Sequence, residues 1–322
     1  MEKDYILMFG CDSGKYPFRY LGIPMHHKKL SNKDWFAIEE RFQKKLSSWK
    51  GKHLSVGGRL VLINSVLSSL AMFMLSFFEV PKGILEKLDY YRSRFFWQSE
   101  EHKKKYRLAK WSILCKPKEC GGLGIQNLEL QNKCLLSKWL YKLMNEEGVW
   151  QNLLRNKYLS KKTLTHVEKK PGDSHFWSSL TIIKNTFLSC GSLRVHNRTQ
   201  VRFWEDRWSG ISPFATRFPE LYSIVRNKNE LVAGVMSTGP LNVSFRRAIV
   251  GKYLKDWLKV VAKVILVSLT NQNDSFVWEA QKNGLFSVNS MYKSIMYRDV
   301  IPKNDMIWKL KVPLKIKIFF GT

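Results

Sequence analysis

The fold is decided by residues 46–97, LSSWKGKHLSVGGRLVLINSVLSSLAMFMLSFFEVPKGILEKLDYYRSRFFW. Within this stretch, residues 60–78 form the longest run without a charged side chain, preceded by a glycine pair and followed by a Val-Pro step. Beyond that step, apolar residues recur at the three- and four-residue spacing of an amphipathic helix. Proline is tolerated in the first turn of a helix, because its missing N–H would have no partner there. The stretch therefore predicts two core helices joined by a tight turn at residues 80–83.

The uncharged run is also long enough to cross a bilayer as a helix. Against a membrane span, the run carries Asn64 and several serines, and Lys and Arg flank it on both sides. A membrane topology signal would place the basic residues on one side only. The first residues, MEKDYILMFG, also lack the basic and apolar regions of a signal peptide. The sequence therefore favours a helix buried in a protein core, and no membrane is expected as a partner.

The charge of the chain is strongly positive. Its 322 residues include 54 Lys and Arg against 26 Asp and Glu, a formal net charge of +28. An excess of this size favours polyanions as partners, nucleic acid first. We therefore expect RNA or DNA as the partner, bound electrostatically and without sequence preference, and no small-molecule substrate. The alternative is a basic protein without a polyanionic ligand.

The five cysteines are scattered along the chain, and no Cys-x-x-Cys occurs. This spacing predicts neither a disulfide framework nor a complete zinc site, and it is typical of an intracellular reducing compartment, nucleus or cytoplasm. The histidines His26, His27, His53 and His102 have no cysteine or carboxylate at ligand spacing. No metal and no cofactor are therefore expected.

The remaining sequence predicts a mainly α fold with small β-hairpins (α+β). Apolar spacing predicts helices over residues 31–50, 127–144, 149–158, 176–187, 245–259 and 287–296. Strand signals predict extended segments at 5–9 and 18–21, a hairpin over 194–208 with its tip at 197–199, and a hairpin joining 276–278 to 285–288 through Asn283-Gly284. We expect a helical domain over 1–160, a polar linker over 161–175 and a mixed domain over 176–322.

The densest basic patch covers residues 100–118, where Tyr106 and Trp111 interleave with lysines. Such interleaving suits a surface that neutralises phosphates and stacks bases, although a charge run is also typical of a solvated face. Further basic residues lie off the apolar stripe of the helix expected over 31–50, or beside the uncharged run. The predicted nucleic-acid contacts are Lys44, Lys45, Lys50, Lys52, Arg59, Lys103, Lys104, Lys105, Arg107 and Lys110.

Catalytic motifs are not found in this sequence. Polymerase-type phosphoryl transfer needs metal ions held by carboxylates, and the chain contains no Asp-Asp pair. Glu205-Asp206 lies between Arg202 and Arg207, which favours an ion-paired structural turn over a catalytic pair. The Gly-Gly-Leu-Gly segment at 121–124 lacks the spacing of a phosphate-binding loop and predicts a flexible turn before a helix. We expect no catalytic residue and no enzymatic activity.

A series of motifs in this order resembles plant LINE-type (non-LTR) retrotransposon reverse transcriptases, in the region that follows the polymerase palm. The resemblance is carried by PFRYLGIPMHHKKLSNKDWFAIEERFQKKLSSWKGKHLSVGGRLVLINSVL, SFFEVPKGILEKLDYYRSRFFW, YRLAKWSILCKPKECGGLGIQNLELQNKCLLSKWLYKL, VWQNLLRNKYL, RFWEDRW, FVWEAQKNGLFSVNSMY and IWKLKVPLKIKIFF. It covers nearly the whole chain. It implies a thumb-like helical domain, then a connecting region that ends at the start of a zinc-binding reverse-transcriptase module. One departure is Asn197-Arg198-Thr199, where relatives tend to carry a glycine-containing turn.

The same resemblance implies that the catalytic parts of the family lie outside this sequence. Its fingers and palm, with the metal-binding aspartates, would precede Met1, and its zinc ligands would follow Phe320. We therefore expect a non-catalytic fragment that binds RNA or DNA without sequence preference. The alternatives are a degenerate transposon remnant or truncated gene model without selected activity, and a thumb-like interaction subunit that acts in trans.

Overall fold

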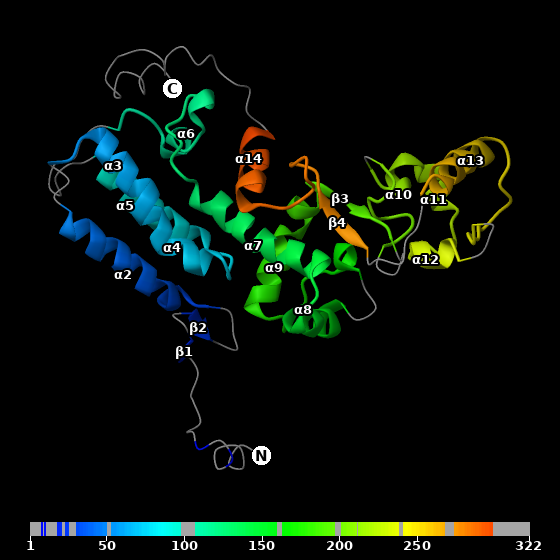
Figure 1. Ribbon diagram of the computed structural model, residues 1–322, viewed down its shortest axis with the longest axis horizontal. Helices are drawn as coiled ribbons and strands as arrows, with labels where there is room; N and C mark the ends of the chain where they lie inside the picture. Colours follow the sequence, from blue (N-terminus) through cyan, green and yellow to red (C-terminus); the bar gives the residue numbers. More distant parts are fainter. Residues whose placement is uncertain are drawn as a thin grey trace. The chain divides into compact units, whose positions relative to one another are not determined.

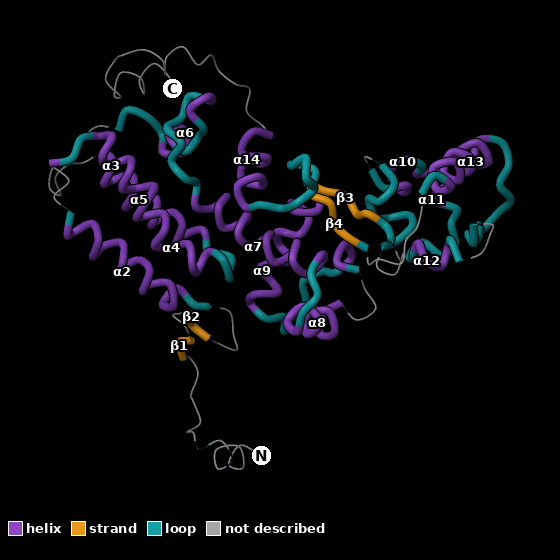
Figure 2. The backbone as a smooth tube through the Cα atoms, viewed as in Figure 1, coloured by secondary structure: helices purple, strands orange, loops and turns teal. Residues whose placement is uncertain are grey.

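In the computed structural model, the described residues are Met8, Gly10, 18–20, 23–25, 30–49, 53–97, 107–159, 163–196, 201–210, 212–237, 241–267 and 274–298. They form a mainly helical fold with two small antiparallel sheets, which confirms the expected fold class (Figures 1 and 2). The chain divides into two compact units, each described by itself. Unit 1 comprises Met1–Leu136, Lys170–Ser179 and Ile295–Thr322; unit 2 comprises Ser137–Lys169 and Leu180–Ser294.

These units interleave in sequence, whereas the sequence analysis expects two consecutive domains. The segment expected as a linker, residues 161–175, contributes to both units. In it, Leu164 and Val167 are buried, and the buried Lys184 donates hydrogen bonds to two of its carbonyl oxygens at 2.8 and 2.6 Å. The described part of the segment around these residues is therefore packed structure. The limits of independently folding domains stay a prediction.

Unit 1 begins with a short hairpin and a long helix. Strand β1 (Phe18–Tyr20) pairs antiparallel with β2 (Ile23–Met25), and helix α2 (Asn32–Ser48) follows. The Asp34 carboxylate accepts hydrogen bonds from the backbone N–H and the hydroxyl of Ser31 at 2.7 and 2.8 Å, which fixes the start of α2. The predicted helix over 31–50 is confirmed.

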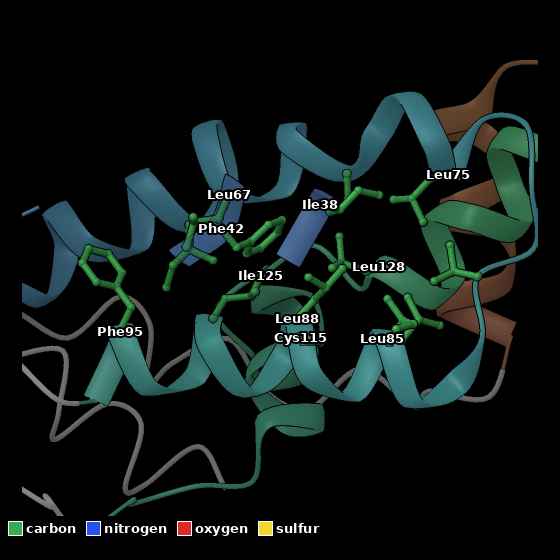
Figure 3. Close-up of a cluster of buried hydrophobic side chains, with 14 of the residues drawn as sticks. Ile38, Phe42, Leu67, Leu75, Leu85, Leu88, Phe95, Cys115, Ile125 and Leu128 are labelled. Atoms are coloured by element: carbon green, nitrogen blue, oxygen red, sulfur yellow. The ribbon is translucent and has the colours of Figure 1, made fainter. Parts of the chain in front are cut away.

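The two predicted core helices are also confirmed. The first is a continuous helical run of α3 (Val56–Leu62), the π-helical turn η2 (Ile63–Leu67) and α4 (Ser68–Leu75); the second is α5 (Lys82–Trp97). Figure 3 shows their side chains meeting, with Leu67 and Leu75 on one side and Leu85, Leu88 and Phe95 on the other. Each fully buried side chain of this kind contributes about 1.5–3 kcal/mol.

The run Val56–Leu75 is, in the described part of the chain, the one helix long and apolar enough to cross a membrane by length and composition. In unit 1 it serves as a core helix, because Ile63, Leu67, Ala71 and Leu75 are buried at successive turns along one side. This burial is the arrangement that the sequence favours over a membrane span.

Unit 1 continues through helix α6 (Trp111–Leu114), the 3-10 turn η3 (Lys118–Cys120) and the first part of α7 (Leu128–Asn145). On α7, Asn132 holds the turn between α4 and α5. Its side-chain amide donates to the carbonyls of Leu75 and Phe78 at 2.7 and 2.8 Å, and its oxygen accepts from the N–H of Val80 at 3.0 Å. Because the last carbonyls of a helix lack intrahelical donors, this side chain provides partners that α4 cannot provide itself.

The glycine segment at 121–124 forms a hydrogen-bonded turn that is buried over 121–123 and exposed at Gly124. The N–H groups of Gly122 and Gly124 donate to the carbonyls of Pro117 and Lys116, both at 2.9 Å. Gly121 and Gly122 are buried. The expected turn before a helix is therefore present, and its flexibility stays a prediction; the sequence does not reveal how closely these glycines approach neighbouring backbone.

A buried charge lies in the core of unit 1. The Arg92 guanidinium is fully buried; it donates to Asp89 at 2.8 Å, to the Ser68 hydroxyl at 3.2 Å and to the Gln126 carbonyl at 2.6 Å. Burial raises the pKa of Asp89, and the attraction of Arg92 only partly offsets it. Burial likewise raises the pKa of the Cys115 thiol to about 12, so that thiol stays protonated near neutral pH.

Unit 2 contains short helices around a two-stranded sheet. Its elements are the rest of α7, α8 (Val149–Leu154), η4 (Arg155–Leu159), η5 (Leu164–His166), most of α9 (His175–Leu188), β3 (Gly191–Arg194), α10 (Phe214–Arg217), α11 (Pro219–Ser223), α12 (Val232–Val235), α13 (Lys252–Ile265), β4 (Ser275–Trp278) and most of α14 (Val288–Arg298). The helices predicted over 127–144, 149–158, 176–187 and 287–296 are confirmed. The helix predicted over 245–259 begins later, at Lys252, because Phe245 forms an isolated bridge with Val225.

In the described residues of unit 2, the strands that pair are not those of the two hairpins expected from sequence, and the expected tip at 197–199 lies outside those residues. Strand β3 pairs antiparallel with β4, and Leu193 lies opposite Phe276. The expected turn at Asn283-Gly284 closes, since the N–H of Trp278 donates to the Gly284 carbonyl at 2.9 Å, but no strand follows it in the described residues. A core of stacked aromatic rings supports the observed pairing, with the ring centroids of Phe187 and Phe276 4.7 Å apart.

Candidate nucleic-acid interface

The exposed side of α2 is rich in basic residues. Its apolar stripe is buried against the core, which leaves Lys44 and Lys45 exposed, as the sequence analysis expects. Lys33 is exposed as well and lies three helical turns before Lys44, about 16 Å along the helix axis. Arg41 adds a further exposed cation, and Glu40 is the exposed acidic residue between them. The exposed surface of α2 therefore offers several cations to phosphates, with one exposed carboxylate among them.

An open groove of about 710 Å³ lies between α2 and the start of α5. Phe36, Pro81 and Ile84 give it an apolar lining, and the side chains of Lys33 and Lys87 line it from the two opposing helices. The Phe36 side chain is 58% exposed, although its neighbour Trp35 is fully buried. The groove therefore exposes an aromatic ring to solvent, and two cations line the same groove.

The polar end of the groove is a hydrogen-bonded cluster around Glu39. This carboxylate accepts from the Tyr91 hydroxyl at 2.9 Å and from the Lys87 ammonium at 3.3 Å, and the Gln43 side chain donates to the Tyr91 hydroxyl at 2.7 Å. Burial, together with the hydrogen bond to Glu39, raises the pKa of Tyr91. The cluster holds the Lys87 ammonium at the groove while most of its side chain stays exposed.

The other predicted contact residues have different outcomes. Arg107 and Lys110 are exposed. Lys50, Lys52, Lys103, Lys104 and Lys105 lie outside the described residues. Trp111, expected as a stacking plane, is partly buried and packs against the core, where the Arg92 guanidinium lies 5.5 Å from its ring centroid.

Arg59 is the predicted contact that the structure corrects. Its side chain is buried, with 7% of the residue exposed, and burial lowers its pKa. Within the described part of the chain, its Nε and Nη1 atoms have no hydrogen-bond partner. A buried guanidinium cannot meet a phosphate from solvent, so Arg59 does not belong to the exposed interface.

The Glu205-Asp206 pair in unit 2 forms an ion-paired structural turn, as expected. Glu205 accepts from Arg202 at 2.7 Å and from the Tyr222 hydroxyl at 2.6 Å, while Asp206 accepts from the Arg202 backbone N–H at 2.7 Å. The His166 ring nitrogens lie 3.4 and 3.3 Å from the two carboxylates. The expected second arginine differs, because Arg207 pairs with Glu279 at 2.8 Å.

This turn predicts a dependence of stability on pH. Burial alone would raise the pKa of Glu205, but the hydrogen bonds from Tyr222 and Arg202 and the nearby positive charges hold it below its ordinary value of 4.5. A carboxylate with a lowered folded-state pKa stabilises the fold above its unfolded-state pKa, and this contribution is lost as pH falls through the folded-state pKa. We therefore expect the free energy of unfolding, measured by urea titration, to fall below about pH 4.5 and to fall less in Glu205→Gln.

The control for the pH experiment is Glu86→Gln. Glu86 pairs with Lys82 at 3.8 Å with both side chains largely exposed, so it should keep the wild-type pH profile. If Glu205→Gln and Glu86→Gln have the same profile as the wild type, the turn does not contribute as described.

Sequence reasoning missed the groove residues Phe36, Lys33 and Lys87. One signal was present, because Phe36 follows Trp35 and therefore falls off the apolar stripe of α2. The approach of α5 to this position was not visible in sequence, because the two helices are joined through several intervening elements.

Comparisons with known proteins find similar proteins in the plant Arabidopsis thaliana. The chain is 30% identical over 319 residues to the Arabidopsis thaliana protein named "Putative ribonuclease H protein At1g65750", an alignment that covers 92% of this chain and 49% of that protein. It is 31% identical over 143 residues to the Arabidopsis thaliana "Uncharacterized mitochondrial protein AtMg00310", with 44% of this chain and 92% of that protein covered. The chain thus spans about half the length of the first relative. No family model matches the chain.

Proposed function

We propose that this chain, which belongs to the same family as the Arabidopsis mitochondrial protein AtMg00310, is a retroelement-derived protein that binds RNA or DNA. The longer relative, named for ribonuclease H, supports a link to nucleic acid. The motif series supports a narrower assignment, to the thumb and connecting region of a LINE-type reverse transcriptase. In this proposal the chain has no polymerase site of its own, and it grips nucleic acid non-catalytically.

The observation that carries the proposal is the exposed basic side of α2. Lys33, Arg41, Lys44 and Lys45 are exposed on one helix of a chain with a net charge of +28. Cations on a rigid helix bind phosphates by releasing counterions, without reading the bases. Binding should therefore be independent of sequence and should weaken steeply with salt.

The test is a titration of the full chain with labelled single strands and RNA–DNA hybrids at several salt concentrations. Lys44→Ala/Lys45→Ala should weaken binding to every sequence and reduce the slope of log K against log salt by about 1–2, because two phosphate contacts are lost. Glu40→Gln should tighten binding, because it removes the negative charge on the same side of α2.

The matched control is Lys282→Ala/Lys293→Ala, which removes the same charge from exposed positions of unit 2. We expect it to change the salt slope by much less. Binding that ignores salt, or a control pair as damaging as the α2 pair, would contradict the proposal. Templated nucleotide incorporation by the same preparation would contradict its non-catalytic part.

A further inference from the structure

We propose that the groove between α2 and α5 binds an unstacked base of single-stranded RNA or DNA, with Phe36 as the stacking surface. This inference rests on the proposed function and names the substrate class of the same interface. Lys33 and Lys87 contact the phosphates on either side of the base. The strand then continues along α2 toward Lys44.

The first argument is the exposure of an aromatic ring in a concave site. Phe36 lines the groove with 58% of the residue exposed, whereas Trp35, Ile38 and Phe42 on the same helix are buried. The core therefore does not need this ring. The groove volume of about 710 Å³ lies within the range of small-molecule sites, so a nucleotide fits.

The second argument is the charge around the ring. Lys33 and Lys87 line the groove from different helices, and Glu39 holds the Lys87 ammonium at 3.3 Å. Glu39 is largely buried and engaged with Tyr91 and Lys87, and the exposed Glu40 lies one helical turn after Phe36 outside the groove lining. The solvent-facing charges of the lining itself are therefore those of Lys33 and Lys87. An anionic chain with flat apolar groups matches this combination.

The third argument distinguishes a single strand from a duplex. Aromatic side chains that grip single strands stack on bases of any identity, and each stacked base contributes substantially to affinity. In a duplex the base faces are already stacked and paired, so a base would first have to be flipped out. A groove that takes one base therefore favours single strands, while the exposed lysines of α2 bind either form.

The test compares a single strand containing 2-aminopurine with the matching duplex. In the full chain, Phe36→Ala should weaken single-strand binding by about 5- to 100-fold and should remove the change in 2-aminopurine fluorescence that binding to the wild type causes. Duplex binding and the salt slope should stay as in the wild type. Phe36→Tyr keeps the ring face and should retain both the affinity and the fluorescence change.

The matched control is Phe73→Ala, which removes an exposed phenylalanine of unit 1 that does not line the groove. It should bind both nucleic acids as the wild type does. Because Phe36 is mostly exposed, its loss should leave the far-UV circular dichroism unchanged. Phe36→Leu keeps an apolar side chain but has no π face, so it tests stacking separately from apolar contact. Phe36→Leu should bind single strands as weakly as Phe36→Ala.

The outcomes separate this inference from the proposed function. If wild type binds nucleic acid with the expected salt slope but Phe36→Ala and Phe36→Leu bind single strands normally, the groove assignment fails alone. Two other results would also overturn it. One is an equal loss of affinity for the single strand and for the duplex in Phe36→Ala. The other is that poly-glutamate displaces the single strand from the wild type but not from the Phe36 variants. If wild type binds no nucleic acid, both proposals fail.

Discussion

An Asn132→Ala substitution is expected to lower the free energy of unfolding by about 3 kcal/mol or more. The side chain is buried, with 3% of the residue exposed, and it satisfies two carbonyls and one N–H of the turn between α4 and α5. Alanine would leave all three backbone groups without this partner in a buried place. Each orphaned group costs about 1–3 kcal/mol, so the sum is large even if the contributions are not additive.

Urea unfolding followed by circular dichroism measures this loss, and hydrogen exchange of the amides between α4 and α5 locates it. The matched control is Asn64→Ala. The Asn64 side chain also bonds to the backbone: its amide donates to the Gly124 carbonyl and its oxygen accepts from the Gln126 N–H, both at 3.2 Å. Asn64 is only half-buried, however. We expect a loss of about 1 kcal/mol there. An equal or smaller loss at Asn132 would show that its three hydrogen bonds do not hold the turn.

This clamp also shows what the sequence could predict and what it could not. The two core helices and the Val-Pro turn follow from apolar spacing and the proline position, which are local signals. The partner of the turn is a single asparagine on α7, more than one helix further along the chain. A polar residue inside an otherwise apolar helical pattern indicates a buried polar contact, but it does not say with which segment.

The strand pairing in unit 2 was missed for a related reason. Asn283-Gly284 is a strong local turn signal, and it does form a turn, yet β4 takes its partner from Gly191–Arg194. Local turn chemistry predicts pairing with the next segment in sequence, whereas sheet pairing is decided by which faces can be buried together. Here the aromatic rings of Phe187 and Phe276 favour the distant strand.

In the candidate interface, too, the sequence predicts the position of some residues correctly and that of another wrongly. The exposure of Lys44 and Lys45 was predicted correctly because they lie off the apolar stripe of their own helix, while their contact with nucleic acid stays a prediction. Arg59 was misplaced, although the signal was present: Arg59, Ile63 and Leu67 are four residues apart, so they share one side of the helical run. That side is buried, so the position of Arg59 on the helix, and not its positive charge, decides where its side chain lies.

A Gly122→Ala substitution is the other change with a large expected effect. Gly122 lies in the buried part of the turn at 121–124, where its added Cβ would overlap the carbonyl oxygen of Lys116. The obstacle is backbone, which cannot rotate away as a side chain would. It belongs to a turn held by the hydrogen bond from Gly124 to Lys116 at 2.9 Å. We expect the free energy of unfolding to fall by about 3 kcal/mol, with the turn displaced.

Two alanine controls in unit 1 separate this clash from the general effect of losing a glycine. Gly124→Ala meets no atom within 4 Å but has a φ of +67°, so it should cost about 1 kcal/mol through backbone strain alone. Gly83→Ala lies in the first turn of α5, with no atom within 4 Å and no positive φ, and should be neutral or stabilise by up to about 0.5 kcal/mol. Urea midpoints in the order Gly83→Ala, Gly124→Ala, Gly122→Ala, from most to least stable, would establish that close backbone approach fixes this turn. If Gly124→Ala and Gly122→Ala have equal urea midpoints, the overlap with Lys116 costs no more than the backbone strain at residue 124. The turn would then have moved to accommodate the added Cβ.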